Sequence, residues 1–466
     1  MKLSLLAAAR EHPRRTALVS AGREMTFAEL VDPVRSAMAW LQPQGGAGPS
    51  PEPIGMLGET SFETLVWIYA AIELGIPLAL VHPRTSASAG RAWLAEIGVA
   101  RWLDPADVDR NAATGTLAET PPDLDSERAL AIVRTSGSSG RPKGVVLSRR
   151  AFVAAARASA LNLGWRDDDR WLLSLPVAHV GGLSVLTRCL MARRAVVIRP
   201  QARFEAATVA RIVAEDRVTL LSLVPTMLGR LLDLEGFELP RYLRAILLGG
   251  AGSPPDLLAR AADRRWPVLT TYGLTEACSQ VATQRYGTVN RGGRGCEPVE
   301  GVEVRIRDGV VEIRGPSLMS GYVPEPATAP FDAEGWLATG DLGRLDDAGR
   351  LHILGRRDDV IVTGGENVHP REVEEALAAH PAIAAACVFG LQDDEWGQVV
   401  AAAVAAASPP TDEALTRYLK GCLAPHQRPR RIAYLEALPE ITLGKIDRRQ
   451  AALGAAPRLR PLSYRR

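Results

Sequence analysis

The spacing of apolar residues along the first two thirds of the chain alternates between two patterns. Segments such as 62–75 and 151–164 place apolar residues three and four positions apart, which predicts helices. Short apolar runs lie between such segments and predict buried strands at 76–83, 129–133, 195–200, 219–225 and 243–250. Because strands and helices alternate, we expect an α/β fold of parallel sheets with helices on both faces.

The pattern changes after about residue 290. Residues 301–322 alternate apolar and polar around Asp308 and Gly309, and residues 343–362 do so around a turn at 346–349, which predicts two hairpins of a small β-rich unit. Beyond residue 355 the pattern predicts a small α+β unit, with helices at 371–381 and 412–425 and strands at 382–393 and 398–407. We therefore expect a large N-terminal domain, 1–356, and a small C-terminal domain, 357–466.

Composition narrows the class of protein. The 466 residues are 47% hydrophobic, and 55 Lys and Arg stand against 53 Asp and Glu, which gives no electrostatic case for binding nucleic acid or an anionic membrane. The five cysteines are far apart and form no C-x-x-C pair, which argues against a disulfide framework or a zinc site and fits a reducing cytoplasm. The apolar N-terminus is too short for a signal peptide and predicts an amphipathic helix. No apolar run reaches the ~20 residues that a membrane span needs.

Residues 135–144, TSGSSGRPKG, directly follow a predicted strand. Glycines let the backbone approach an anion, hydroxyl groups and a lysine add donors, and successive N–H groups can form an anion-binding nest. The spacing differs from that of the P-loop. A flexible Gly/Ser linker is the alternative, and we predict a phosphate-binding loop. Its residues are Thr135, Ser136, Gly137, Ser138, Ser139, Gly140 and Lys143.

Four further motifs follow in order along the chain. They are YGLTEACSQ at 272–280, ATGDLGRLD at 338–346, GRRDDVIVTGGENVHPREVEEAL at 355–377 and TLGKIDRR at 442–449. Together with the loop they resemble the adenylate-forming superfamily, which includes acyl-CoA synthetases, firefly luciferase and the adenylation domains of peptide synthetases. The resemblance extends from residue 135 to residue 449.

The resemblance implies a reaction in which a carboxylate attacks the α-phosphate of ATP, pyrophosphate leaves, and coenzyme A then takes the acyl group. Two anions must meet in such a reaction, so cations and hydrogen-bond donors have to offset their repulsion. By resemblance, Lys143 holds the β- and γ-phosphates, Thr275 bonds a phosphate oxygen, and Glu276 binds Mg²⁺, which prefers oxygen ligands. Lys445 contacts both the carboxylate and the α-phosphate.

The remaining nucleotide contacts are also implied by the resemblance. Asp341, supported by Arg356, takes the ribose hydroxyls. The turn of Gly250, Ala251 and Gly252, together with Tyr272 and Gly273, surrounds the adenine. Asp358 falls at the hinge on which the small domain rotates, and Gly364 and Gly365 then face the path of the thiol.

Each assignment has a plainer alternative. Thr275 and Glu276 fit a helix N-cap with a first-turn acid, and Asp341 fits a turn. Residues 247–254 fit an ordinary βα turn, Lys445 a solvated surface lysine, and Asp358 a turn within a hairpin.

The acid substrate is indicated by the stretch 175–190, which by resemblance borders the acyl pocket. His179 is a candidate for a catalytic, pocket-gating or structural role. Arg188 lies among apolar residues, and a buried arginine needs an anion. That anion is either an internal Asp or Glu or a second carboxylate on the substrate. Ser222, Ser279 and Gln280 are expected nearby as hydrogen-bond donors.

Four short segments resemble the o-succinylbenzoate–CoA ligases of menaquinone synthesis: HVGGLSVL at 179–186, VPTML at 224–228, TEACSQVAT at 275–283 and TGGENVHP at 363–370. This resemblance implies 2-succinylbenzoate as the acid, with Arg188 pairing its benzoate group. Two departures border the pocket, in VAHV where relatives have a bulky residue before the His, and in ACSQ where several differ before the Cys.

Three functions therefore stand side by side. The first is an AMP-forming acid–CoA ligase, cytoplasmic, with ATP, Mg²⁺ and coenzyme A, acting on 2-succinylbenzoate or another aryl or acyl acid. The second is an adenylation enzyme that loads a carrier protein. The third is a non-catalytic nucleotide-binding relative, against which the presence of Lys143, Glu276, Asp341 and Lys445 argues. A homodimer is possible.

Overall fold

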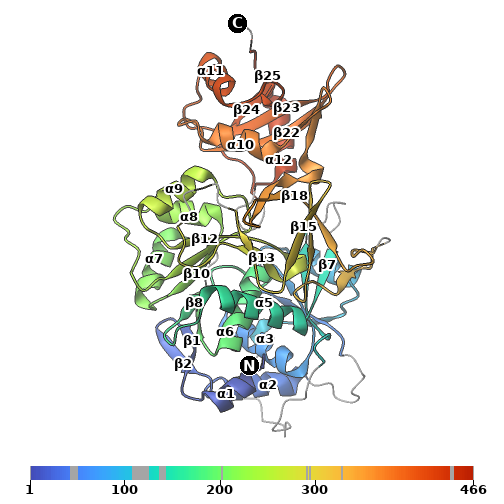
Figure 1. The fold of residues 1–466 in the computed structure, drawn as a ribbon. Helices are drawn as coiled ribbons and strands as arrows, with labels where there is room; N and C mark the ends of the chain where they lie inside the picture. Colours follow the sequence, from blue (N-terminus) through green and yellow to red (C-terminus); the bar gives the residue numbers. More distant parts are fainter. Residues whose placement is uncertain are drawn as a thin grey trace.

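A computed structural model describes residues 2–41, 51–107, 125–135, 143–200, 203–289, 292, 295–326, 329–440 and 446–464. Four sheets carry the fold. Figure 1 shows the C-terminal sheet and its helices at one end of the molecule and the other three sheets below them. This arrangement confirms the predicted α/β class with a large N-terminal part and a small C-terminal part.

The first sheet has nine strands, and its centre is parallel as predicted. The strand order is β14 (Glu297–Pro298), β13 (Ser279–Thr283), β12 (Val268–Leu274), β11 (Ala245–Leu248), β10 (Leu220–Leu223), β8 (Arg170–Leu172), β9 (Ala195–Ile198), β1 (Thr16–Ser20) and β2 (Arg23–Thr26). The two edges turn antiparallel, at β1–β2 and at β12–β13–β14. Neither antiparallel edge was predicted from the sequence.

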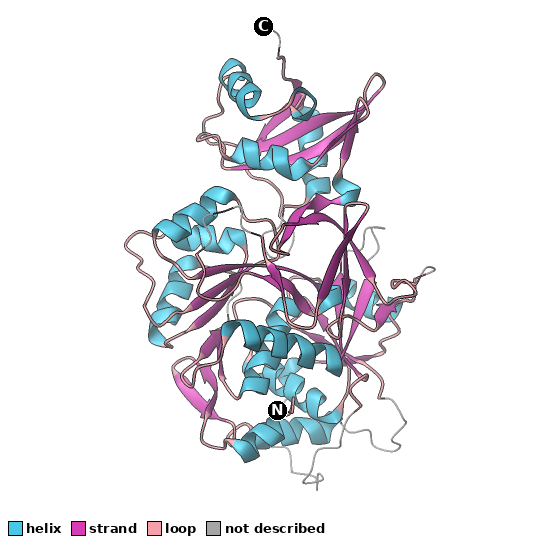
Figure 2. Ribbon diagram, viewed as in Figure 1, coloured by secondary structure: helices cyan, strands magenta, loops and turns pink. Residues whose placement is uncertain are grey.

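Helices cover both faces of this sheet (Figure 2). One face packs on α7 (Ala206–Glu215), α8 (Pro225–Leu232) and α9 (Pro255–Asp263) in one apolar core. The other face packs on α5 (Arg149–Leu163) and α6 (Val180–Ala192), whose buried residues belong to a core shared with the second sheet. The two helices therefore lie between two sheets.

The second sheet has the order β17 (Gly321–Val323), β7 (Lys143–Ser148), β6 (Ala129–Thr135), β4 (Leu78–Val81), β3 (Ile54–Leu57) and β5 (Arg101–Leu103). Its helices are α1 (Leu5–Glu11), α2 (Val31–Leu41), α3 (Phe62–Leu74) and α4 (Ala87–Glu96). Residues Leu5 to Ala9 of α1 are all buried, so the predicted amphipathic character of this helix is wrong. Within the described residues no helix has the length and apolar character needed to cross a bilayer.

The third sheet consists of the two predicted hairpins. Its strands are β15 (Glu303–Arg307), β16 (Val310–Arg314), β18 (Leu337–Leu345) and β19 (Leu351–Arg356). Asp308 and Gly309 turn the first hairpin with φ of 50° and 78°, as a two-residue turn requires.

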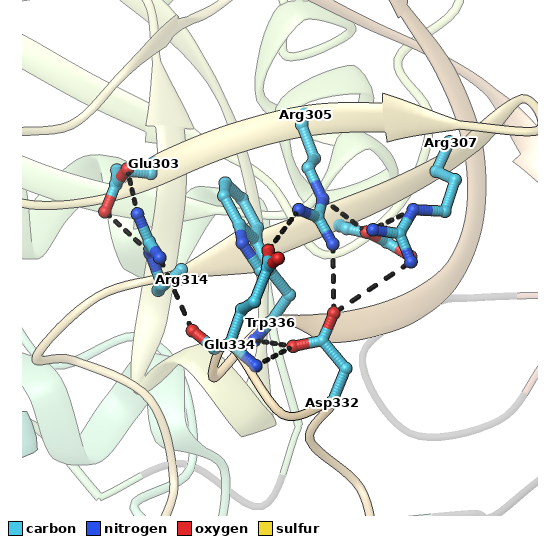
Figure 3. A network of polar contacts seen from close by, with 8 residues as sticks. Glu303, Arg305, Arg307, Arg314, Asp332, Glu334 and Trp336 are labelled. Atoms are coloured by element: carbon cyan, nitrogen blue, oxygen red, sulfur yellow. Dashed lines mark hydrogen bonds and ion pairs between the residues drawn. The ribbon is translucent and has the colours of Figure 1, made fainter.

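A network of ion pairs and arginine–tryptophan contacts lies on one face of this sheet (Figure 3). The guanidinium carbons of Arg305 and Arg314 lie 4.1 Å and 4.7 Å from the ring centre of Trp336. Arg305 also donates to Glu312 at 2.6 Å, and Arg314 pairs with Glu303 at 2.7 Å. Single exposed ion pairs contribute little to stability, but this set joins β15, β16 and the segment that leads into β18.

The fourth sheet contains β20 (Ile361–Thr363), β21 (Glu366–Val368), β22 (Ala385–Asp393), β23 (Gly397–Ala405), β24 (Arg431–Leu435) and β25 (Arg460–Pro461). The helices α10 (Pro370–Ala378), α11 (Asp412–Cys422) and α12 (Arg448–Ala455) accompany it. Among the described residues, its main apolar core draws on residues from 361 onward. The short helix η3 (Arg357–Asp359) connects it to β19.

Candidate active site

Asp341 lies at the centre of the nucleotide side of the candidate site. Its side chain is buried on β18, directly opposite Arg356 of β19, as the sequence predicted. Arg356 Nη1 donates to Asp341 Oδ1 at 3.2 Å, and the hydroxyl of Tyr272 donates to Asp341 Oδ2 at 2.6 Å. Burial, and then the charge of Asp341, raise the pKa of the Tyr272 hydroxyl, so it stays protonated and keeps donating. The structure thus brings together three residues assigned to the nucleotide.

The predicted adenine turn follows β11, beside the strand that carries Tyr272. Gly250 has φ of 83°, which favours glycine. Gly250, Ala251 and Gly252 lie at the carboxyl end of a parallel strand, where α/β sheets bind ligands, and their contact with the adenine stays a prediction. Gly273 has a structural reason as well, since a Cβ there would lie 1.7 Å from the carbonyl oxygen of Ser279 across the β12–β13 pair.

Glu276 lies in the short helix η2 (Thr275–Ala277), just after β12. The residue that caps this helix is Leu274, without a side-chain bond, so the N-cap alternative for Thr275 is wrong. The hydroxyl of Tyr322, from β17, donates to Glu276 Oε1 at 3.1 Å. Lys143 Nζ lies 5.2 Å from the ring centre of the same tyrosine. Tyr322 thus connects the predicted metal ligand with the predicted phosphate-binding lysine, and it was not predicted.

The predicted phosphate loop joins two antiparallel strands of the second sheet. Thr135 ends β6 and lies opposite Lys143, which begins β7. Ser136, Gly137, Ser138, Ser139 and Gly140 lie outside the described residues, as does Lys445. A carboxylate beside bound phosphates is the donor set that Mg²⁺ favours, because this ion is held by one or two carboxylates and the phosphates of its substrate. Glu276 fits that role.

Arg188 lies on the acid side of the candidate site, on α6. Its side chain is 3% exposed, and its Nη2 donates to Ser279 Oγ at 3.3 Å. Its guanidinium carbon lies 5.6 Å from the ring centre of Trp171. Among the described residues no Asp or Glu pairs with it, and its Nε has no hydrogen-bond partner. Burial lowers the pKa of Arg188 to about 10, which still leaves it charged at neutral pH.

The other predicted pocket residues divide into two groups. Ser279 contacts Arg188, and Ser222 accepts a hydrogen bond from the indole of Trp171 at 3.1 Å, so both belong to the surroundings of Arg188. Gln280 differs. Its Nε2 donates to Thr283 at 2.8 Å and to Thr271 at 3.3 Å, and its buried Oε1 has no partner in the described structure, so its role as a donor to the acid stays a prediction.

His179 precedes α6 and is half-buried. Its ring centre lies 5.2 Å from that of His82, and its Nε2 has no hydrogen-bond partner in the described part of the chain. Burial, and then the neighbouring His82, lower the pKa of His179 to about 4, so the ring is neutral at physiological pH. His82 Nδ1 accepts a hydrogen bond from the backbone of Arg84 at 3.0 Å. His82 was not predicted, although a histidine just after a buried parallel strand is a usable signal.

The residues that the resemblance assigns to the hinge and to the path of the thiol lie in the C-terminal part. Asp358 is in η3, between the third and fourth sheets. Gly364 and Gly365 form the turn between β20 and β21, with φ of 58° and 84°. A Cβ on Gly364 would lie 2.6 Å from the ring of Trp396, so this turn is packed on its own unit in the present arrangement.

Comparison with known proteins fits this geometry. The family model for AMP-binding enzymes matches residues 5–323, and the model for the C-terminal domain of the same enzymes matches residues 372–445. The chain belongs to the AMP-binding enzyme family. A family member from Bacillus cereus, the 2-succinylbenzoate–CoA ligase, is 35% identical over 94% of this chain and 95% of its own length.

Solved structures of the AMP-binding enzyme family resemble the whole chain. The o-succinylbenzoate CoA synthetase from Bacillus subtilis with its acyl-adenylate intermediate has a TM-score of 0.85 at 31% identity, covering 96% of this chain and 97% of its own. ATP-bound MatB from Rhodopseudomonas palustris also has a TM-score of 0.85, at 25% identity, covering 97% and 98%. A double mutant of the Bacillus subtilis enzyme bound with a product analogue has a TM-score of 0.70, at 31% identity, covering 98% and 99%.

Proposed function

We propose that this chain is an AMP-forming ligase that joins 2-succinylbenzoate to coenzyme A with ATP and Mg²⁺, in the cytoplasm and as a step of menaquinone synthesis. Family membership and the names of its relatives support acid activation. The observation that carries the choice of acid is Arg188, a buried cation without a carboxylate partner in the described structure.

Arg188 calls for an anion from outside the chain. A buried charge is costly unless it is paired, and a guanidinium matches a carboxylate in two parallel hydrogen bonds. The acid 2-succinylbenzoate has two carboxylates. If the benzoate group pairs with Arg188, the succinyl arm is left for activation. A monocarboxylic fatty acid would leave the cation unpaired.

The residues of the nucleotide side would then perform the first half of the reaction. Asp341 would accept the ribose hydroxyls while Tyr272 and Arg356 hold its carboxylate in place. Lys143 and the loop that it ends would bind the departing pyrophosphate. Mg²⁺, held by Glu276, would neutralise phosphate charge. Lys445 would bring the acid carboxylate and the α-phosphate together, with residues 357–466 acting as the domain that carries it.

The second half of the reaction would use the C-terminal part. The thiolate of coenzyme A attacks the acyl carbon of the acyl-adenylate and AMP leaves. Rotation at Asp358 would bring Gly364 and Gly365 to the thiol. The five cysteines are free, which fits a reducing cytoplasm. A homodimer stays a prediction.

One assay tests the proposal against its alternatives. The full-length enzyme is given ATP and Mg²⁺ with 2-succinylbenzoate, benzoate or a fatty acid, with and without coenzyme A, and pyrophosphate and thioester are followed. We expect both products with 2-succinylbenzoate. Pyrophosphate without thioester would favour an enzyme that loads a carrier protein. A preference for another acid would overturn the choice of substrate, and no release with any acid would favour a non-catalytic relative.

A further inference from the structure

One arginine of the C-terminal part reaches two places in the N-terminal part. Arg371 lies in the first turn of α10, and its Nη1 donates to the backbone oxygen of Ile353, on β19, at 3.1 Å. Its guanidinium also lies against Gly252. A Cβ built on that glycine would be 3.1 Å from Arg371 Cζ and 3.3 Å from its Nε. Arg371 therefore bridges β19 and the turn after β11.

Both contacts lie beside groups assigned to the nucleotide. Ile353 is on the strand that carries Arg356, the partner of Asp341. Gly252 ends the turn proposed to hold the adenine. Glu375, one helical turn further along α10, accepts a hydrogen bond from Arg371 Nε at 2.8 Å and so fixes the direction of the guanidinium. The side chain is 32% exposed and is not part of an apolar core.

We propose that Arg371 is a positioning residue for adenylate formation, which holds the C-terminal part over the nucleotide turn while the acid is activated. Residues 446–464, which directly follow Lys445 in the sequence, belong to the same C-terminal part as α10. The inference rests on the proposed function. It assigns Arg371 to the adenylation half-reaction and not to transfer of the acyl group to coenzyme A.

Two solved relatives differ in how closely they match the arrangement described here. This structure matches the acyl-adenylate complex from Bacillus subtilis with a TM-score of 0.85 and the complex with the product analogue with 0.70, although the second match covers slightly more of the chain. A contact between α10 and the nucleotide turn belongs to the arrangement described here.

A purely structural role for Arg371 makes a different prediction. If Arg371 served only its ion pair with Glu375, its loss would slightly destabilise the first turn of α10. Both half-reactions would then respond alike. A hydrogen bond from a charged donor to a backbone oxygen is stronger, so its loss slows the step that uses it by about tenfold.

The test measures the two half-reactions separately in the full-length enzyme. Single-turnover pyrophosphate release from 2-succinylbenzoate and ATP reports the first, and thioester formation from supplied 2-succinylbenzoyl-adenylate and coenzyme A reports the second. We expect Arg371→Ala to lose about tenfold in the first and less than twofold in the second, and Arg371→Lys to recover part of the loss. Arg417→Ala, on the exposed face of α11, is the matched control and should change neither.

Two outcomes would overturn the assignment: equal losses in both half-reactions, or no loss in either. If the wild-type enzyme releases no pyrophosphate with 2-succinylbenzoate but does so with another acid, the proposed substrate fails. The Arg371 comparison is then made with that acid, so the two failures remain distinguishable.

Gly252→Ala provides an independent check. The added methyl group would press on the guanidinium in the wild type, and its three nearest contacts would be gone in the Arg371→Ala background. We expect the substitution to slow adenylation in the first background and to have a smaller effect in the second, because contacting residues are not additive. Equal effects in both backgrounds would contradict the proposal.

Discussion

The two sides of the candidate site differ in how their polar groups are satisfied. On the nucleotide side, Asp341 is held by Tyr272 and Arg356, and Glu276 is held by Tyr322. On the acid side, buried polar atoms of Arg188, His179 and Gln280 have no partner in the described structure. Among the described residues the carboxylates of the nucleotide side thus already have partners, and we expect the acid to complete the other side.

This difference suggests that the two sides have different tasks, one in the reaction of ATP and the other in the choice of the acid. A preorganised set of donors and charges serves any acid that reaches it, since it acts on the ATP. A buried polar group that lacks a partner costs about 1–3 kcal/mol, and a ligand that pairs it recovers that cost. An acid that leaves the group unpaired binds less favourably by about this free energy. The acid side should therefore decide which carboxylate is used.

The largest expected effect belongs to Lys445, the residue proposed to contact both the acid and the α-phosphate. Lys445→Ala should slow pyrophosphate release on the order of 10²–10³-fold with every acid, because a preorganised cation is lost where negative charge develops. Lys420→Ala, an exposed lysine of α11, is the matched control. A loss of less than tenfold, or a loss seen with one acid only, would contradict the role given to Lys445.

The acid side is tested by Arg188→Met. We expect kcat/KM for 2-succinylbenzoate to fall on the order of 10²-fold, because the benzoate loses its buried partner, while the KM for ATP changes less than twofold. The unliganded variant should be as stable as the wild type or more so, since an apolar residue replaces an unpaired buried charge.

Arg244→Met is the informative contrast to Arg188→Met. Arg244 is also buried, but it pairs with the buried Asp169 at 2.6 Å. Breaking such a pair leaves an unpaired carboxylate and costs about 3–5 kcal/mol of stability. The unfolding temperature should therefore fall for Arg244→Met and should not fall for Arg188→Met. If Arg188→Met unfolds or loses ATP binding as well, Arg188 is a structural residue.

The variant Tyr322→Phe tests the nucleotide side with a smaller chemical change. The change removes only the hydroxyl that bonds Glu276, and partners of metal-ligating groups typically influence metal affinity about 10-fold or more. We expect the Mg²⁺ concentration for half-maximal pyrophosphate release to rise by about tenfold with an unchanged KM for the acid. Tyr242→Phe, whose hydroxyl bonds the backbone of Val213 and Ala214, is the control. An unchanged Mg²⁺ requirement would contradict the placement of the metal.

The smallest expected effect concerns His179 and acid pH. Its pKa is about 4 in the folded protein and near 6.5 when unfolded, so the unfolded chain takes up a proton first as the pH falls. Stability is therefore lost between pH 6.5 and pH 4, by about 1 kcal/mol between pH 7.5 and pH 5.5. Urea unfolding of His179→Gln should show a weaker pH dependence over this range than the wild type does. Identical pH dependences in the two proteins would contradict the neutral state of His179.

Local patterns predicted much of the fold. The parallel centre of the first sheet follows from apolar runs between helical segments, and both hairpins of the third sheet follow from alternation around turn residues. The helix α6 is harder to predict from its sequence, because it begins at Val180 and contains two glycines, which are poor helix formers. Gly182 is required there, since a Cβ would lie 2.3 Å from the backbone oxygen of Pro176.

Part of the candidate site could also be predicted from local sequence patterns. Arg188 could be recognised because its apolar neighbours lie on the same helix, and Arg356 because it follows Asp341 across a short hairpin. Tyr322, His82 and Trp171 reach their partners from distant strands. Such pairings depend on how the two sheets pack on each other, which local sequence does not specify.

The most direct test of the central claim compares two acids in two enzymes. The acid 4-oxo-4-phenylbutanoate has the arm of 2-succinylbenzoate but lacks the ring carboxylate. We predict that the wild type prefers 2-succinylbenzoate in kcat/KM on the order of 10²-fold, and that Arg188→Met loses most of this preference with little change toward the analogue. A preference that survives the substitution, or an equal loss with both acids, would contradict the claim that Arg188 binds the second carboxylate.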